Sequence, residues 1–149
     1  VNHLGRVFDQ VFDLQRIARI SAGAAWRSLD DDGKSSYSQL LRDVLLGTYV
    51  ARFDADRGQV LEVLSSREVK PGRDLVQSKI VRPSGESVSL VYYLRDNKVF
   101  NVEADGVSDL SVRRADYASV IKRDGFPKLL EQMRDQFDSS RAAFTESRL

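Results

Sequence analysis

The 149-residue chain contains no cysteine and only one histidine, and these two absences exclude much reactive chemistry. Without cysteine there is no disulfide, no thiolate nucleophile and no cysteine-ligated metal. The one histidine, His3, leaves a Ser-His-Asp triad or a histidine-based metal site almost nothing to work with, and we expect it in a loose N-terminal segment. We therefore expect no metal, no cofactor and no catalytic histidine.

The chain also lacks a long apolar run and an excess of charge of either sign. Its longest apolar stretch is LVYYL at Leu90–Leu94, far short of the ~20 residues that a membrane-spanning helix needs. The 23 basic and 22 acidic residues nearly cancel, so no nucleic-acid partner is expected. Dinucleotide, phosphate-loop and EF-hand motifs are missing. The opening VNHLGRVFDQ has no signal-peptide pattern, so we expect either no signal peptide or a processed chain.

The first part of the chain has helical periodicity. Apolar residues recur at helical spacing over 7–29, with an interruption, and again over Leu40–Phe53. Aspartates at 30–32 supply acceptors and negative charge where the second helix starts. The apolar residues of this second helix cover well over half of its circumference: Leu40, Leu41, Val44, Leu45, Leu46, Tyr49, Val50 and Phe53. Protein or a ligand must therefore cover more than one of its sides.

After Gly58 the apolar period changes to two, and turn residues separate the segments. We expect four strands, at Gln59–Val69, Leu75–Arg82, Val88–Arg95 and Val99–Ala104. The short turns between them favour an antiparallel meander. In the third strand Leu90, Tyr92 and Leu94 share one strongly apolar face, which needs a cover.

Two further helices are expected after the strands. One covers Asp109–Arg123, and the other begins near Phe126-Pro127, with proline in a tolerated first-turn position. Residues 139–149 show no clear period and are expected to form a flexible tail. Helices, a meander and then helices predict an α+β fold, with the helices on one sheet face and a single domain at 1–138.

The residues alone leave several function classes open. Helices and sheet can close on each other as a plain core, which gives an interaction module without a ligand. A small-substrate enzyme on a cone-shaped α+β scaffold needs a buried carboxylate of raised pKa, and the predicted strands place none on the apolar face. Asp54 and Asp56 come nearest to an acid–base pair, but Arg52 and Arg57 beside them favour an ordinary loop. The broad apolar helix also fits a protein with a pocket for an apolar ligand.

Six short motifs follow one another between Phe12 and Phe137. They are FDLQRIARISAGAAW, LLRDVLLGTY, SKIVRPSG, SLVYYLR, NKVFNVEADGVS, and a Gly-Phe pair that opens a leucine-rich helix at Gly125–Leu130. None is specific alone, but in this order and spacing they resemble the MlaC/toluene-tolerance family of periplasmic lipid-binding proteins. The chain departs from the family pattern at Asn97, where tryptophan is usual, and in DLSVRRADYASVIK, which replaces a run containing Asn-Tyr-Arg. TYVARFDADRGQVLEV at Thr48–Val63 is more similar to the branch associated with hopanoid biosynthesis.

The resemblance implies a fold and a function. The fold is a curved, four-stranded antiparallel sheet covered by N- and C-terminal helices around an apolar cavity. The function is that of a monomeric periplasmic carrier without enzyme activity, which holds phospholipid or a hopanoid-like lipid with its acyl chains inside. Its expected membrane partners are an inner-membrane ABC transporter complex and an outer-membrane lipoprotein complex. The expected lipid-binding residues are Leu41, Leu45, Tyr49, Leu90, Tyr92, Leu94, Tyr117, Val120, Ile121 and Leu130.

Overall fold

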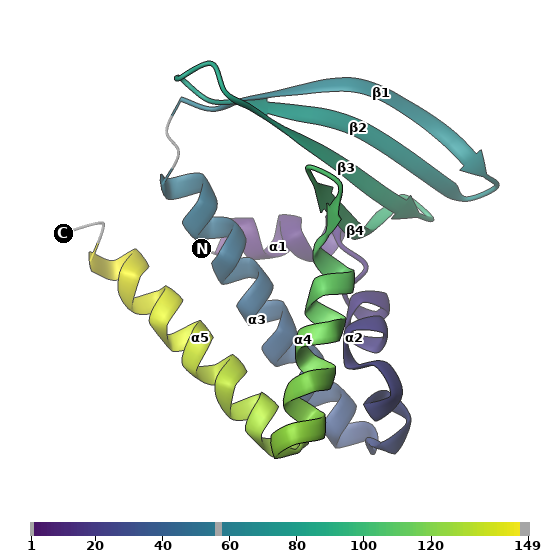
Figure 1. The fold of residues 1–149 in the computed structure, drawn as a ribbon, viewed down its shortest axis with the longest axis vertical. Helices are drawn as coiled ribbons and strands as arrows, with labels where there is room; N and C mark the ends of the chain where they lie inside the picture. Colours follow the sequence, from purple (N-terminus) through teal and green to yellow (C-terminus); the bar gives the residue numbers. More distant parts are fainter. Residues whose placement is uncertain (1, 56–57, 147–149) are drawn as a thin grey trace. The chain divides into compact units, whose positions relative to one another are not determined.

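Helices come before and after a run of strands along the chain, so the α+β prediction is confirmed (Figure 1). The computed structural model describes residues 2–55 and 58–146, and among these it describes the side chains at 3, 5–49 and 58–142. The helices are α1 (Asn2–Val11), α2 (Leu14–Ala22), the 3-10 helix η1 (Gly23–Ser28), α3 (Asp31–Ala55), α4 (Asp109–Asp124) and α5 (Phe126–Glu146). The strands are β1 (Val60–Lys70), β2 (Arg73–Val81), β3 (Ser87–Arg95), β4 (Lys98–Ala104) and β5 (Val107–Ser108).

These elements form two units, which are described separately. The sheet unit consists of Val1–Ile17 and Asp56–Arg113, and the helical unit consists of Ala18–Ala55 and Arg114–Leu149. The boundaries between the units fall inside α2 and α4 and at the end of α3.

The sheet unit contains a curved antiparallel sheet with the strand order β1-β2-β3-β4-β5. The four predicted strands are confirmed to within two residues at each end, and the short β5 is an addition. Asp96 and Asn97 join β3 to β4 and both have positive φ, as in the type I′ turn that suits a two-residue hairpin. Asparagine tolerates this backbone conformation well.

β1 is an edge strand with two irregularities. All eleven of its residues are exposed, including several large apolar ones. Its pairing with β2 shifts register between Val63 and Ser65 and again between Glu68 and Lys70, so Leu64 and Val69 are bulged out of the ladder.

The end of α1 is attached to β4 within the sheet unit. Phe12 forms a parallel bridge with Val99, and the Asp13 N–H donates to the Val99 carbonyl at 2.9 Å. The ring of Phe12 stacks on Phe8 with centroids 4.4 Å apart, and Phe8 and Val99 are both buried. His3 lies on α1 and is exposed, so the expectation of a loose segment around His3 is wrong. Phe8 and Phe12 supply the apolar contact that allows this segment to be ordered.

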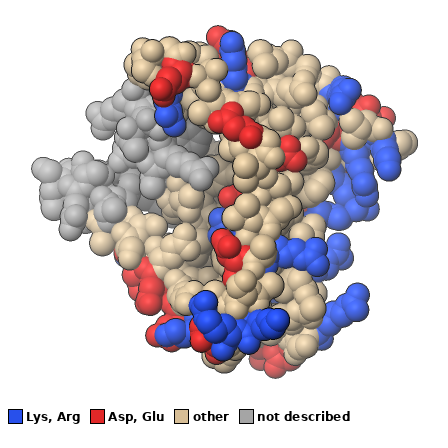
Figure 2. Space-filling model, in the orientation of Figure 1, with Lys and Arg blue, Asp and Glu red and all other residues tan. Residues whose placement is uncertain are grey.

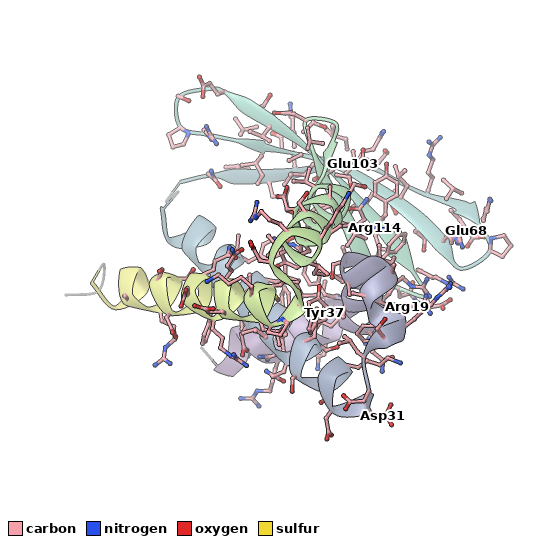
Figure 3. The ribbon with its side chains drawn as sticks, turned by 60° about the horizontal axis from the view of Figure 1, so that its bottom comes forward. Arg19, Asp31, Tyr37, Glu68, Glu103 and Arg114 are labelled. Carbon is pink, nitrogen blue, oxygen red and sulfur yellow. The ribbon has the colours of Figure 1, made fainter. Side chains whose placement is uncertain are left out.

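The helical unit has an aromatic cluster around Tyr37 of α3, which is fully buried (Figure 3). Its ring centroid lies 6.4 Å from that of Trp26, 6.4 Å from that of Tyr117 and 5.8 Å from that of Phe126. The Tyr37 hydroxyl is 2.6 Å from the Ser21 hydroxyl. Because the Ser21 hydroxyl donates to the Ala18 carbonyl at 3.1 Å, Tyr37 is the donor to Ser21. The cluster thus joins η1, α3, α4 and α5, with α2 bonded to it through Ser21.

The helix ends follow the predicted signals at two places. The Asp30 carboxylate accepts a hydrogen bond from the Gly33 N–H at 2.7 Å and caps α3. Gly125 has a φ of +89° and its N–H donates to the Ile121 carbonyl, so it ends α4 directly before α5 begins.

α5 continues to Glu146, beyond the domain boundary predicted at residue 138. A Cβ at Gly47 would lie 3.4 Å from the Cβ of Ser140, which is an ordinary packing distance between α3 and α5. Small residues at this contact let the helices approach closely without the apolar period that the sequence prediction relied on.

Tyr37→Phe tests the buried hydrogen bond of the aromatic cluster. The substitution removes only the hydroxyl, and Ser21 and Tyr37 are 1% and 0% exposed. We expect the free energy of unfolding to fall by about 1–2 kcal/mol, and thermal melts should show a Tm lower by about 2–4 °C for each kcal/mol lost. Ser36→Ala, at an exposed position of the same helix, is the control. An unchanged Tm for Tyr37→Phe would contradict the assigned bond.

Candidate functional site

The strand register places one apolar surface on the sheet, which we call the apolar sheet face. Its first two rows across β1 to β4 are Glu68, Asp74, Leu94 and Val99, followed by Ser66, Val76, Tyr92 and Val102. The next two rows are Val63, Ser78, Leu90 and Ala104, followed by Leu61, Ile80 and Val88. The prediction that Leu90, Tyr92 and Leu94 share a face is therefore confirmed, and all three are half-buried.

The apolar sheet face is polar at one corner and apolar elsewhere. Glu68, Asp74 and Ser66 lie together near the hairpin that joins β1 to β2. The two rows farthest from this hairpin contain no charged side chain. Asp74 lies on this face because β2 begins at Arg73, before the predicted start at Leu75, but Asp74 is only half-buried and Glu68 is exposed, so neither is the buried carboxylate that the enzyme alternative needs.

Ser78 is the one polar residue in these two uncharged rows. Its hydroxyl forms a hydrogen bond within the sheet. It is 1% exposed, and it donates to the Leu90 carbonyl at 3.0 Å. A buried hydroxyl with a partner carries little penalty. Ser78 is smaller than Val76 and Ile80, its neighbours on the same face of β2. It therefore fills less space there, and its hydroxyl is not left unpaired.

The opposite sheet face has a mixed character. Lys79 forms an ion pair with Glu62 at 3.4 Å, and the Ser65 hydroxyl donates to Gln77 at 2.9 Å. Tyr93 also lies on this face, where a hydrogen bond to the Glu103 carboxylate, with smaller contributions from burial and from the Glu103 charge, raises the pKa of its hydroxyl. Lys79, Ser65 and Tyr93 thus each have a polar side-chain partner on a neighbouring strand.

The other predicted lipid-binding residues belong to the helical unit. On α3, Leu41 is 0% exposed, Leu45 is 5% exposed and Tyr49 is half-buried, and their spacing of four puts them on one stripe. Tyr117 of α4 is buried against Tyr37, as described above. Val120, Ile121 and Leu130 are half-buried. That these residues line one pocket together with the apolar sheet face stays a prediction.

Reactive groups do not gather in the part of the chain that the structure describes. Within it, no three His, Cys, Asp or Glu side chains are placed to hold a metal ion. No helix in the described ranges has the length and apolar character to cross a membrane. The side chains of Asp54 and Asp56 lie outside the described residues. Figure 2 shows side chains of both charges on the face drawn, with wide areas that carry neither.

An open antiparallel sheet with one largely apolar face, preceded and followed by helices, defines the α+β class. The chain belongs to the MlaC protein family, whose model matches residues 1–135. A solved structure with the same fold is that of the phospholipid-binding protein from Ralstonia solanacearum in complex with a phospholipid. The two structures have a TM-score of 0.78 and 21% sequence identity, over 94% of this chain and 83% of that chain. Comparison with the curated proteins gave no match.

Leu41→Asp tests whether the stripe on α3 is closed core. Leu41 is fully buried, so an aspartate there has no solvent and no partner. We expect a loss of several kcal/mol, on the order of 4 or more, which circular dichroism melts should detect as unfolding at a much lower temperature. Ser36→Asp, exposed near the start of the same helix, should change stability by less than about 0.5 kcal/mol. A well-folded Leu41→Asp variant would instead mean that water reaches this position, as it does in a ligand pocket.

Proposed function

We propose that the chain is a lipid carrier that binds phospholipid with the acyl chains on the apolar sheet face. The observation that carries this proposal is the pair of adjacent uncharged rows, one across β1 to β4 and one across β1 to β3, which form an apolar surface. Membership of the MlaC family and the phospholipid in the related Ralstonia solanacearum structure support the same ligand class.

The energetics of an acyl chain explain why such a carrier is needed. Each exposed CH₂ group costs about 0.8 kcal/mol in water, which gives on the order of 12 kcal/mol for a sixteen-carbon chain. A lipid held on the apolar sheet face is therefore released slowly into water. Transfer then requires a partner that accepts the acyl chains directly, and it makes and breaks no covalent bond.

This requirement suggests where the carrier acts. The chain works in the periplasm as a monomer and exchanges lipid with an inner-membrane ABC transporter complex and an outer-membrane lipoprotein complex. Family membership supports this part of the proposal. A hopanoid-like lipid is the alternative ligand. The uncharged rows provide apolar surface without a specific polar contact, so they do not distinguish fused rings from acyl chains.

Lipid extraction from gently purified protein is the direct test. Mass spectrometry should find co-purified phospholipid in near-stoichiometric amount. A panel of lipids should then show affinity that rises with acyl chain length and depends less on headgroup charge, because the uncharged rows of the apolar sheet face provide the binding energy. Protein that carries no lipid and binds none in the panel would refute the proposal, and affinity set by one headgroup alone would contradict the role of the apolar rows.

Leu90→Asp and Val91→Asp form a matched pair that tests the face. Leu90 lies on the apolar sheet face and Val91 on the opposite face, and both are half-buried neighbours on β3. We expect Leu90→Asp to lower phospholipid affinity at least tenfold, because the aspartate charge makes an unfavourable contact with the acyl chains. A loss of about 1.4 kcal/mol of binding free energy corresponds to that factor. Val91→Asp should retain nearly full affinity. Thermal melts of both proteins control for folding, and equal loss in two folded variants would show that the face is assigned wrongly.

A further inference from the structure

Two adjacent tyrosines on β3 have contrasting surroundings. Tyr93 lies on the mixed face, and its hydroxyl bonds to the Glu103 carboxylate. Tyr92 lies on the apolar sheet face, between Val76 of β2 and Val102 of β4. Among the described residues, no side chain forms a hydrogen bond with the Tyr92 hydroxyl, and burial alone raises its pKa. A tyrosine hydroxyl is neutral at physiological pH and can donate a hydrogen bond, and the neighbours of Tyr92 across the strands are valines.

The position of Tyr92 in the rows is the second observation. On one side along the strand direction is a row with Glu68 and Asp74 on β1 and β2 and the apolar Leu94 and Val99 on β3 and β4, so Asp74 is a diagonal neighbour of Tyr92. On the other side are the two uncharged rows that end at Leu61, Ile80 and Val88. Same-face residues on a strand are about 7 Å apart, so roughly 13 Å of uncharged surface extends along β3 from Tyr92 to Val88. Tyr92 therefore lies at the boundary between the polar corner and the apolar part of the face.

A phospholipid has a boundary of the same kind. Its glycerol esters join the polar headgroup to the acyl chains, and each ester carbonyl oxygen accepts hydrogen bonds. A lipid with its acyl chains on the uncharged rows brings this ester region toward Tyr92 and its headgroup toward Glu68 and Asp74. Figure 3 labels Glu68 near the end of the long strands.

We propose that the Tyr92 hydroxyl donates a hydrogen bond to an ester carbonyl oxygen of the bound lipid, and so sets the depth at which the lipid lies and favours ester-linked lipids. This inference rests on the proposed function. It names a residue that determines specificity, in addition to the apolar rows that provide general affinity. A carbonyl oxygen is a good acceptor and the corresponding ether oxygen is a poor one, so the linkage is what Tyr92 distinguishes.

The experiment compares two lipids and three proteins. The lipids are a diester phosphatidylcholine and its diether analogue, with equal chain length and headgroup, and the proteins are the wild type, Tyr92→Phe and Tyr93→Phe. The wild type should prefer the diester by about five- to tenfold, which is the usual worth of one neutral hydrogen bond. Tyr92→Phe should bind the diester as weakly as the wild type binds the diether, and its affinity for the diether should be unchanged. Tyr93→Phe, on the opposite face, should keep the wild-type preference.

Infrared spectra of lipid bound to the wild type provide a second measurement, independent of the stability of any variant. With isotope-labelled ester carbonyls, the carbonyl stretch of bound diester should lie at lower frequency than that of the same lipid in apolar solvent. Tyr92→Phe should remove this shift. Equal loss of affinity for both lipids in Tyr92→Phe, or no ester preference in a wild type that binds both, overturns the role of Tyr92 and leaves the carrier function standing. A wild type that binds neither lipid overturns both.

Discussion

The pairing of β2 with β3 is the constraint on which the proposed site depends. It runs from Arg73 opposite Arg95 to Val81 opposite Ser87 without a register shift. Because side chains alternate with a period of two, a slip by one residue in β3 would move Leu90, Tyr92 and Leu94 to the other face. The turn between the two strands holds this register, with the Arg82 N–H donating to the Glu86 carbonyl at 2.8 Å and the Gly85 N–H to the Arg82 carbonyl at 2.9 Å. The set of side chains on the apolar sheet face therefore depends on this alignment.

Much of the fold was predictable from the sequence because its signals are local. Period-two apolar patterns and turn residues placed four strands, and Asp30, Gly125 and Pro127 marked helix ends. Elements without such a signal were missed. β5 has two residues, too few to show a period, and it is defined by pairing with β4. α5 approaches α3 at the small residues Ser140 and Gly47, so the apolar period that predicts helices is absent at this contact.

The candidate site was predictable only within single elements. Alternation put Leu90, Tyr92 and Leu94 on one face, and a spacing of four put Leu41, Leu45 and Tyr49 on one stripe. Partners across the strands need the register, which includes irregularities. On β4, plain alternation groups Val99 with Asn101, but a shift beside Phe100 puts Val99 opposite Leu94 and Asn101 opposite Tyr93. The boundary position of Tyr92 is therefore a property of four aligned strands, and no stretch of sequence contains it.

The two bulges of β1 limit what can join this edge of the sheet. An incoming strand needs an unbroken series of evenly spaced backbone donors and acceptors, and regular pairing on β1 is confined to Val60–Val63 and Ser65–Glu68. Each of these runs is shorter than the usual strand of about five to six residues. Since β1 is fully exposed and rich in valine and leucine, an unbroken edge would be a template for chain-to-chain aggregation. The bulges at Leu64 and Val69 thus lower the tendency of this exposed edge strand to pair with other chains at high protein concentration.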